Sequence, residues 1–344
     1  MKRAVPARGA ACTARADLFR LLTGYQLSQS ICVVAALGIA DLLRDGPLSA
    51  VCLAKATRTD ADALYRLMRA LAAAGVFDEG KNAMFSLAPM GELLRDDAVG
   101  SHAPMARLFG SSENWRAWGA LLHSIRSGET AFDHVHGCSV WQHRKIDVEA
   151  TSIFDRAMSA GTNSYARAVL DVYDFGGFSH VVDVGGGEGT FLARILAAHP
   201  HLRGTLFDQP HVVANRPIPL QDPGLSGRWT AVAGDFFKAV PEAADVYLLK
   251  WILHDWDDMA CITILRVIRE AMTPTSRLLV IEHVIGPPNA EPEGKFLDLM
   301  MLVMTGGRER TREEFGALRC AGGLRLSAVT STRAALSIIE AVPQ

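Results

Sequence analysis

The sequence lacks the features with which proteins bind nucleic acids or membranes. Its 344 residues carry 35 Lys and Arg against 37 Asp and Glu, for a net charge of −2, without a long run of like charges. A polyanionic partner is therefore not expected. No apolar run reaches the roughly 18 residues that span a bilayer, and the N-terminus does not have the pattern of a secretory signal. We expect a soluble, cytoplasmic protein that binds neither nucleic acid nor membrane.

Disulfides and metal centres are not indicated either. The six cysteines show neither CxxC spacing nor pairing with His, and a chain of this length does not need disulfides to fold. They are interpreted as reduced thiols. Asp255, Asp257 and Asp258 lie close together in the sequence, but no His joins them at ligand spacing. We therefore expect no metal.

The N-terminal part predicts a mainly helical domain. Apolar residues recur at helical spacing from Leu18 to Leu42, on more than one side of the helix, so this segment needs cover from more than one neighbour. Both a subunit interface and a buried helix within the chain would supply it. A helix over 60–74, a hairpin around 80–82 and a helix from Pro89 then give a winged-helix outline. The 60–74 helix carries few cations, which disfavours binding to DNA.

The rest of the chain predicts helices followed by an α/β domain. We expect domains at 1–100 (winged-helix-like, for dimerisation), 101–172 (a helical connector that caps the substrate) and 173–344 (catalytic). Strands alternate with helices in the last part, which indicates a parallel, doubly wound Rossmann-like sheet with its ligand beyond the carboxyl ends of the strands. The strands are expected near 179–184, 203–207, 229–233, 245–250, 277–285 and 324–330, with a last segment near 334–342.

A glycine turn in VVDVGGGEGTF indicates the cofactor. It follows a strand and precedes a helix, and Asp208 ends the next strand, as in a nucleotide-binding βαβ unit. Thr190 stands where a dinucleotide motif requires its third glycine. Asp183 and Glu188 would repel a pyrophosphate, whereas S-adenosylmethionine is cationic and still offers a ribose diol to Asp208. The pattern therefore favours S-adenosylmethionine.

Residues that could take part in catalysis or bind a charged ligand follow the later strands. His254, four residues after a strand, is suited to accept a proton near neutral pH, and a phenol is the favoured donor of that proton. Glu282 or Glu309 could orient its imidazole, although either could instead pair with a nearby Arg. Lys250 ends a strand and requires an anionic partner. Asp257 is the expected N-cap of the next helix.

Other positions suggest contacts to the ligands. Asp235 with Phe236 could bind an adenine, although Asp235 could instead cap a helix or a turn. The methionine-rich run that contains Met300 and Met304 could form an apolar wall for an aromatic ring, or belong to the core.

These motifs, with FDQPHV, LLKWILHDWDD and GGRERTREEF in this order, resemble the caffeate-type O-methyltransferases, which depend on S-adenosylmethionine, and the bacterial natural-product branch most. Gly161 and Met304 depart from plant relatives. The resemblance implies a homodimer of class I methyltransferase fold. It implies cofactor contacts by Gly185, Asp208, Gln209, Asp235, Phe236 and Lys250, catalysis by His254, Glu282 and Glu309, and substrate contacts by Phe154, Met158, Asp255, Met300 and Met304.

The sequence thus predicts methylation of a phenolic hydroxyl on a small aromatic metabolite. Three alternatives remain. A nicotinamide-dependent oxidoreductase could use the same sheet, a non-catalytic winged-helix regulator could sense a small molecule, and the acids from Asp255 to Asp258 could assist transfer through a metal. Neither the substrate nor the methylated position follows from the sequence.

Overall fold

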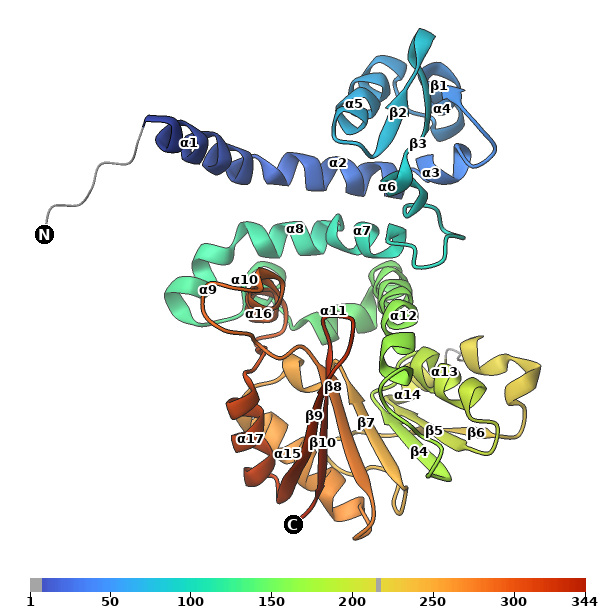
Figure 1. Ribbon diagram of the computed structural model, residues 1–344, viewed down its shortest axis with the longest axis vertical. Coiled ribbons are helices and arrows are strands. Elements are labelled where there is room, and N and C mark those ends of the chain that lie inside the picture. The colour runs from blue at the N-terminus through green and yellow to red at the C-terminus, as the bar shows by residue number, and fades with distance from the viewer. Residues whose placement is uncertain (1–7, 215–217) are drawn as a thin grey trace, which may run out of the picture. The chain divides into compact units, whose positions relative to one another are not determined.

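The computed structural model describes residues 8–214 and 218–344 (Figure 1). The chain forms two compact units that divide between Ser111 and Ser112. The three-part division expected from the sequence remains a prediction. Among the described helices, none is long and apolar enough to cross a membrane.

The first unit begins with three helices where the sequence predicts one continuous helical segment. The chain leaves the helix at Thr23, and Gly38 adopts a left-handed conformation with φ of 64°, which glycine reaches without steric cost. Leu21, on the first helix, is 75% exposed, and other apolar residues of that helix are exposed as well. The helices are α1 (Arg8–Leu22), α2 (Gly24–Ala36) and α3 (Ile39–Leu42).

The elements predicted to form a winged helix come next in the chain. The strands form a three-stranded antiparallel sheet in the order β1-β3-β2. Asp60 caps α5 through a 2.8 Å bond from the Ala63 N–H. Leu53, Met68 and Phe85 are fully buried in the shared core. The elements are β1 (Leu48–Ser49), α4 (Ala50–Thr57), α5 (Ala61–Ala73), β2 (Phe77–Glu79), the 3₁₀ turn η1 (Lys81–Ala83), β3 (Met84–Leu87), α6 (Pro89–Glu92) and α7 (Ala103–Phe109).

The second unit opens with helices that lead to the sheet. The longest, α12, starts at a cap in which Asp147 accepts the Ala150 N–H at 2.9 Å. Asp257 caps α15 in the same way, as the sequence predicts. The helices before the sheet are α8 (Ser112–Gly119), α9 (Leu121–Ser127), α10 (Ala131–His136), α11 (Val140–Ile146) and α12 (Val148–Leu170).

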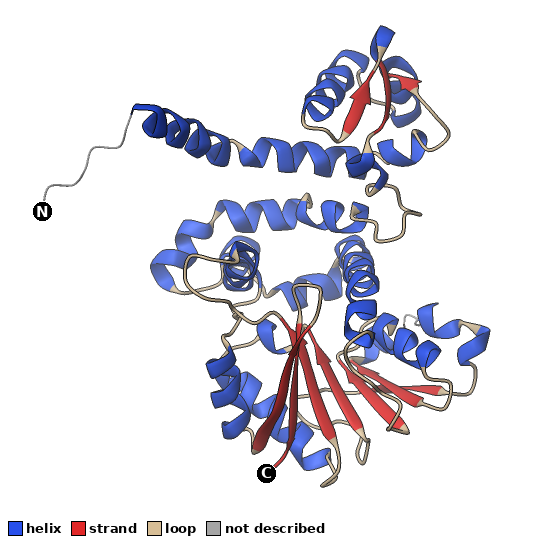
Figure 2. Cartoon of the chain, viewed as in Figure 1, coloured by secondary structure: helices blue, strands red, loops and turns tan. Residues whose placement is uncertain are grey.

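Seven strands form one mixed sheet in the order β6-β5-β4-β7-β8-β10-β9 (Figure 2). The expectation of a parallel sheet is wrong for β10, which runs antiparallel to both β8 and β9. Only residues 332–336 separate β9 from β10, too few for the crossover that a parallel pair requires. The strands are β4 (His180–Val184), β5 (Arg203–Asp208), β6 (Trp229–Ala233), β7 (Val246–Lys250), β8 (Arg277–Glu282), β9 (Leu324–Ser331) and β10 (Ser337–Pro343).

Helices cover both faces of this sheet, so apolar residues of its central strands are buried. One core joins the sheet to α15 and α17 through residues such as Ile264 and Phe315, and the other joins it to α13 through residues such as Leu192. The remaining helical elements are α13 (Thr190–Ala198), α14 (Pro210–Val213), η2 (Ile218–Gln221), η3 (Pro223–Leu225), η4 (Leu253–Asp255), α15 (Asp258–Ala271), α16 (Pro292–Met304) and α17 (Arg312–Ala321).

Candidate active site

The glycine turn connects β4 to α13 at the carboxyl edge of the sheet. Gly185 has φ of 70°, and a Cβ at this position would overlap the Ile252 side chain. Gly187 also has positive φ, and its N–H donates to Asp208 Oδ2 at 2.8 Å. The Gln209 N–H donates to the other oxygen of Asp208 at 2.6 Å. Two backbone bonds therefore fix the Asp208 carboxylate at the end of β5, as expected of a residue that binds a ribose diol.

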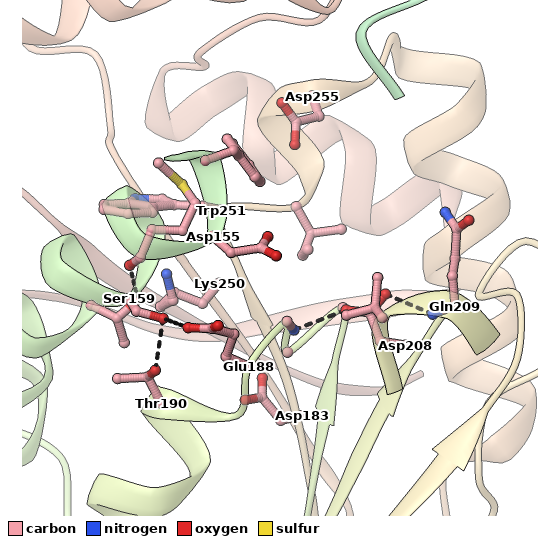
Figure 3. Close-up of a pocket in the computed structure, with 18 of the residues that line it drawn as sticks. Asp155, Ser159, Asp183, Glu188, Thr190, Asp208, Gln209, Lys250, Trp251 and Asp255 are labelled. Carbon is pink, nitrogen blue, oxygen red and sulfur yellow. Dashed lines mark hydrogen bonds between the residues drawn. The ribbon is translucent and has the colours of Figure 1, made fainter. Parts of the chain in front are cut away.

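Helix α12 lies against this turn and is joined to it by hydroxyl groups. Ser159 Oγ donates to Glu188 Oε2 at 2.5 Å and accepts from Thr190 Oγ1 at 3.0 Å (Figure 3). Further α12 residues line the same cavity at helical spacing, among them Asp155 and Met158. Helix and turn thus line one cavity together. Its lining residues include Trp141, Arg144, Phe154, Asp155, Met158, Ser159, Asp183, Gly185, Glu188, Asp208, Gln209, Phe236, Lys250, Trp251, Asp255 and Trp256.

The cavity gathers acids whose ionisation is opposed by burial. Burial raises the pKa of Asp183 to about 7 and that of Asp155 to about 6. It also raises the pKa of Asp208, and it lowers that of Lys250 to about 8, against the attraction of Asp183. Asp183 Oδ2 is buried without a hydrogen-bond partner among the described residues. A cationic ligand would stabilise the ionised form of these acids, whereas a pyrophosphate would be repelled.

The chain turns sharply after β7. Trp251 has φ of 55°, a conformation that costs energy for a residue with a side chain and is characteristic of functional sites. The carboxylate of Glu282 binds the following 3₁₀ turn, η4. Its Oε1 accepts the N–H groups of Ile252 at 3.0 Å, Leu253 at 2.6 Å and His254 at 3.3 Å. Glu282 therefore contacts the backbone of the turn, and the described contacts do not join it to the imidazole.

Glu309 is the acid that contacts the imidazole. His254 Nδ1 lies 2.6 Å from Glu309 Oε1, and both side chains are buried. His254 Nε2 lies 3.9 Å from Asp255 Oδ1. Burial lowers the pKa of His254, but Asp255, Glu309 and Glu282 outweigh it and raise that pKa to about 9. The pair has the arrangement of a base whose tautomer is set by a carboxylate.

The loop that carries Glu309 is fixed to η4 by Arg310. Its guanidinium is fully buried and donates to the carbonyls of Leu253 at 3.0 Å and Trp256 at 2.8 Å, and to Asp258 Oδ1 at 2.9 Å. The sequence left open a surface ion pair between Glu309 and a neighbouring Arg; in the structure Arg310 binds Asp258. Gly307 passes so close to the His254 carbonyl that a Cβ would overlap it.

The cavity includes many of the residues singled out in the sequence. It is lined by Gly185, Asp208, Gln209, Phe236 and Lys250 among the expected cofactor contacts, and by Phe154, Met158 and Asp255 among the expected substrate contacts.

Other expected site residues lie outside the lining. Asp235 accepts the Phe237 N–H at 3.0 Å and lies 3.4 Å from Lys238, the turn cap that the sequence allowed. Met300 and Met304 pack in a core cluster against Phe132 and Trp141. His254 and Glu309 are also outside the lining, but His254 Nε2 lies 3.9 Å from Oδ1 of Asp255, which lines the cavity.

Sequence reasoning missed Arg144, Asp155 and Ser159. Asp155 and Ser159 are the residues that follow Phe154 and Met158, so the helical spacing of that pair was the available signal. Arg144 lies on another helix, and only the tertiary structure brings it to the cavity. Among the described residues, no group of three or more His, Cys, Asp or Glu is placed to hold a metal ion.

Comparison with known proteins agrees with this geometry. An O-methyltransferase domain matches residues 118–325, and an O-methyltransferase dimerisation domain matches residues 19–97. The chain belongs to the O-methyltransferase family. It is 43% identical over 327 residues to phenazine O-methyltransferase PhzM of Lysobacter antibioticus, with 95% of each chain covered. This O-methyltransferase uses S-adenosylmethionine as its methyl donor.

Two crystal structures are similar over nearly the whole chain. LaPhzM has a TM-score of 0.93 and 42% identity, with 96% of this chain and 99% of that chain covered. An O-methyltransferase of neocarzinostatin biosynthesis, solved with S-adenosylmethionine and 2-hydroxy-5-methyl naphthoic acid, has a TM-score of 0.80 and 34% identity, with 92% and 96% covered. The S-adenosylmethionine-binding fold expected from the sequence, with its N-terminal helical domain, is thereby confirmed.

The residues of the cavity fit this cofactor. The fixed carboxylate of Asp208 would accept the hydroxyls of a ribose, and Phe236 is an aromatic residue of the lining that would stack on an adenine. The unpartnered Asp183 oxygen and the acids of α12 and the glycine turn suit a ligand with a sulfonium and an ammonium group.

Proposed function

We propose that this enzyme methylates a phenolic hydroxyl of a small aromatic metabolite and that His254 is its general base. The observation that carries the proposal is the buried contact of 2.6 Å between His254 and Glu309, next to the cavity-lining Asp255. S-adenosylmethionine supplies a methyl group made electrophilic by a sulfonium. The protein must hold an acceptor oxygen toward that group and take up its proton.

The electrostatics of His254 favour a phenol as the proton donor. An ordinary imidazole, with a pKa of about 6.5, lies roughly 3.5 units below a phenol at about 10, a gap of about 5 kcal/mol. The raised pKa of about 9 reduces this gap to about one unit, or about 1.4 kcal/mol. The same shift leaves most of the imidazole protonated at neutral pH. Because only the neutral form accepts a proton, activity should rise with pH toward 9.

Aromatic side chains on the acceptor side suit a flat ring. Trp141 and Trp256 stack with their centroids 6.2 Å apart, and Phe154 meets Trp141 edge to face at 6.3 Å. All three line the cavity. The Lysobacter relative is named a phenazine O-methyltransferase, and the enzyme of neocarzinostatin biosynthesis was crystallised with a naphthoic acid, which supports an aromatic natural-product precursor as substrate. We retain Met300 and Met304 as substrate contacts of the proposal, since both belong to the same core cluster as Trp141, which lines the cavity.

We further propose that the enzyme is a homodimer. The dimerisation domain includes the exposed apolar residues Leu21 and Leu22 of α1, which a second copy would cover. Sedimentation equilibrium should give twice the mass of 37.2 kDa. A monomer at micromolar concentration would contradict this assignment.

The test of the function is methylation of a panel of hydroxylated benzoates, naphthalenes and phenazines, with products identified by mass spectrometry. His254→Ala should lower kcat by about 10²-fold or more, because the proton acceptor is lost, while affinity for S-adenosylhomocysteine stays within a few-fold. Turnover that remains within a few-fold of wild type would remove His254 as the base. Activity that survives EDTA would exclude the metal-assisted alternative.

A further inference from the structure

Arg144 is a cation of the cavity that the methyl-transfer chemistry described above does not use. It belongs to α11 and lines the cavity together with its neighbours Trp141 and Lys145. Its guanidinium makes no hydrogen bond or ion pair with another described side chain, and its Nε is buried without any partner among the described residues. Burying part of a charged guanidinium is unfavourable unless an anion or a hydrogen-bond acceptor pairs with it.

Aromatic rings hold the guanidinium in place. Its central carbon lies 3.5 Å from the centroid of the Phe154 ring and 5.3 Å from that of Trp141. Such stacking orients the planar fork without satisfying its N–H donors. Burial lowers the pKa of Arg144 to about 10, against the attraction of nearby acids, so the group remains charged at neutral pH. The cavity therefore presents an oriented cation with free donors.

The surroundings of Arg144 place it on the acceptor side. It interacts electrostatically with Asp255, the neighbour of His254, and its aromatic partner Trp141 stacks on Trp256. In Figure 3, Asp255 lies well apart from Glu188 of the glycine turn and from Asp208, which accepts a hydrogen bond from that turn. An anion bound by Arg144 would therefore belong to the methyl acceptor rather than to the cofactor.

The acids of the cavity do not replace such an anion. Asp155 and Asp255 both interact with Arg144, yet burial still raises the pKa of each to about 6. Neither forms an ion pair with it, and the third acid, Glu113, lies 3.4 Å from His143. The planar fork of Arg matches the two oxygens of a carboxylate, which it binds in a bidentate manner.

We propose that Arg144 binds a carboxylate on the aromatic ring of the acceptor, so that the substrates are hydroxylated aromatic carboxylic acids. This inference rests on the proposed function, because it assigns the substrate class of the same site. Arg144 then determines specificity: the anion fixes one edge of the ring while the hydroxyl faces the base.

The experiment compares matched pairs of an acid and its methyl ester, such as 3,4-dihydroxybenzoate and 2-hydroxy-1-naphthoate with their esters. Wild-type enzyme should prefer the acid in kcat/KM by at least about 10-fold, as expected for a charge-assisted pair. Arg144→Gln should lose about 10- to 100-fold on the acids but only a few-fold on the esters. Arg144→Lys should recover part of the loss. Arg126→Gln, an exposed Arg outside the lining, is the matched control and should leave both unchanged.

Binding is measured in parallel by tryptophan fluorescence, with each ligand added to enzyme saturated with S-adenosylhomocysteine. Tighter binding of acids without methylation of any ring hydroxyl would leave Arg144 as the carboxylate site and overturn the proposed function. Equal use of acids and esters by the wild type would overturn the role of Arg144 and leave the function standing. A tenfold loss of S-adenosylhomocysteine affinity in Arg144→Gln would assign the residue to the cofactor and also overturn the proposal.

Discussion

Replacing Glu309 by Gln tests the electrostatic account of the base. The change removes one negative charge and keeps the size of the side chain, 2.6 Å from His254 Nδ1. An opposite charge at such a distance raises the pKa of a cation by about 1 to 3 units, and Asp255 and Glu282 also contribute to the value of about 9. We therefore expect the pKa of His254 in the variant to fall by roughly 1 to 2 units.

The assay is kcat/KM measured from pH 6 to 10, which reports the ionisation of the free enzyme. A base is active when deprotonated, so wild-type activity should rise with pH and level off above about 9. In Glu309→Gln the rise should occur at lower pH, since the imidazole loses its proton more easily, and the plateau should be lower because the ring is less well oriented. The phenol also ionises near pH 10, but its own pKa does not change with the variant.

Glu313→Gln removes an exposed carboxylate of α17 and is the matched control, with an unchanged profile. If the inflection of Glu309→Gln stays where the wild type has it, Glu309 does not set the basicity of His254, and the proposed pair is wrong. An inflection that is lost only in His254→Ala, and moved in Glu309→Gln, would support the base and its partner separately.

Two further variants test a residue expected to bind the cofactor and a glycine that packs against η4. Asp208→Ala removes the carboxylate that accepts the N–H groups of Gly187 and Gln209. Calorimetry should show that S-adenosylhomocysteine binds about 10- to 100-fold more weakly. Unchanged affinity would exclude Asp208 from the cofactor site. Gly307→Ala forces a Cβ against the His254 carbonyl and should lower kcat at least about tenfold with little change in cofactor affinity. A variant with wild-type kcat would show that η4 tolerates displacement.

Local patterns in the sequence determined most of the fold. The strand ends at Val184, Asp208 and Lys250 follow from short apolar runs, and the glycine turn follows from residue types that tolerate positive φ. The direction of β10 did not follow from alternation, because a mixed edge depends on how short the preceding connection is. The break at Gly38 was missed because helical periodicity continues across it.

The identity of the base candidate and of its possible acids came from the sequence, but their pairing did not. In the sequence, Glu282 and Glu309 are both candidates to orient His254. Only the tertiary structure shows that Glu282 accepts backbone N–H groups of η4 and that Glu309 contacts the imidazole. The same holds for Asp235, which caps a turn outside the cavity lining, and for Arg144, which reaches the cavity from a helix more than 100 residues before His254.

There is a physical reason why some features could be predicted from the sequence and others appeared only in the tertiary structure. Turn geometry, helix caps and strand composition depend on neighbours in sequence, so the glycine turn and the S-adenosylmethionine fold could be predicted from the chain alone. Hydrogen bonds between side chains, burial and the pKa shifts that follow depend on residues far apart in sequence, such as His254 and Glu309. The sequence therefore determined the cofactor and the family, and the tertiary structure decided which acid contacts His254 and brought Arg144 to the cavity.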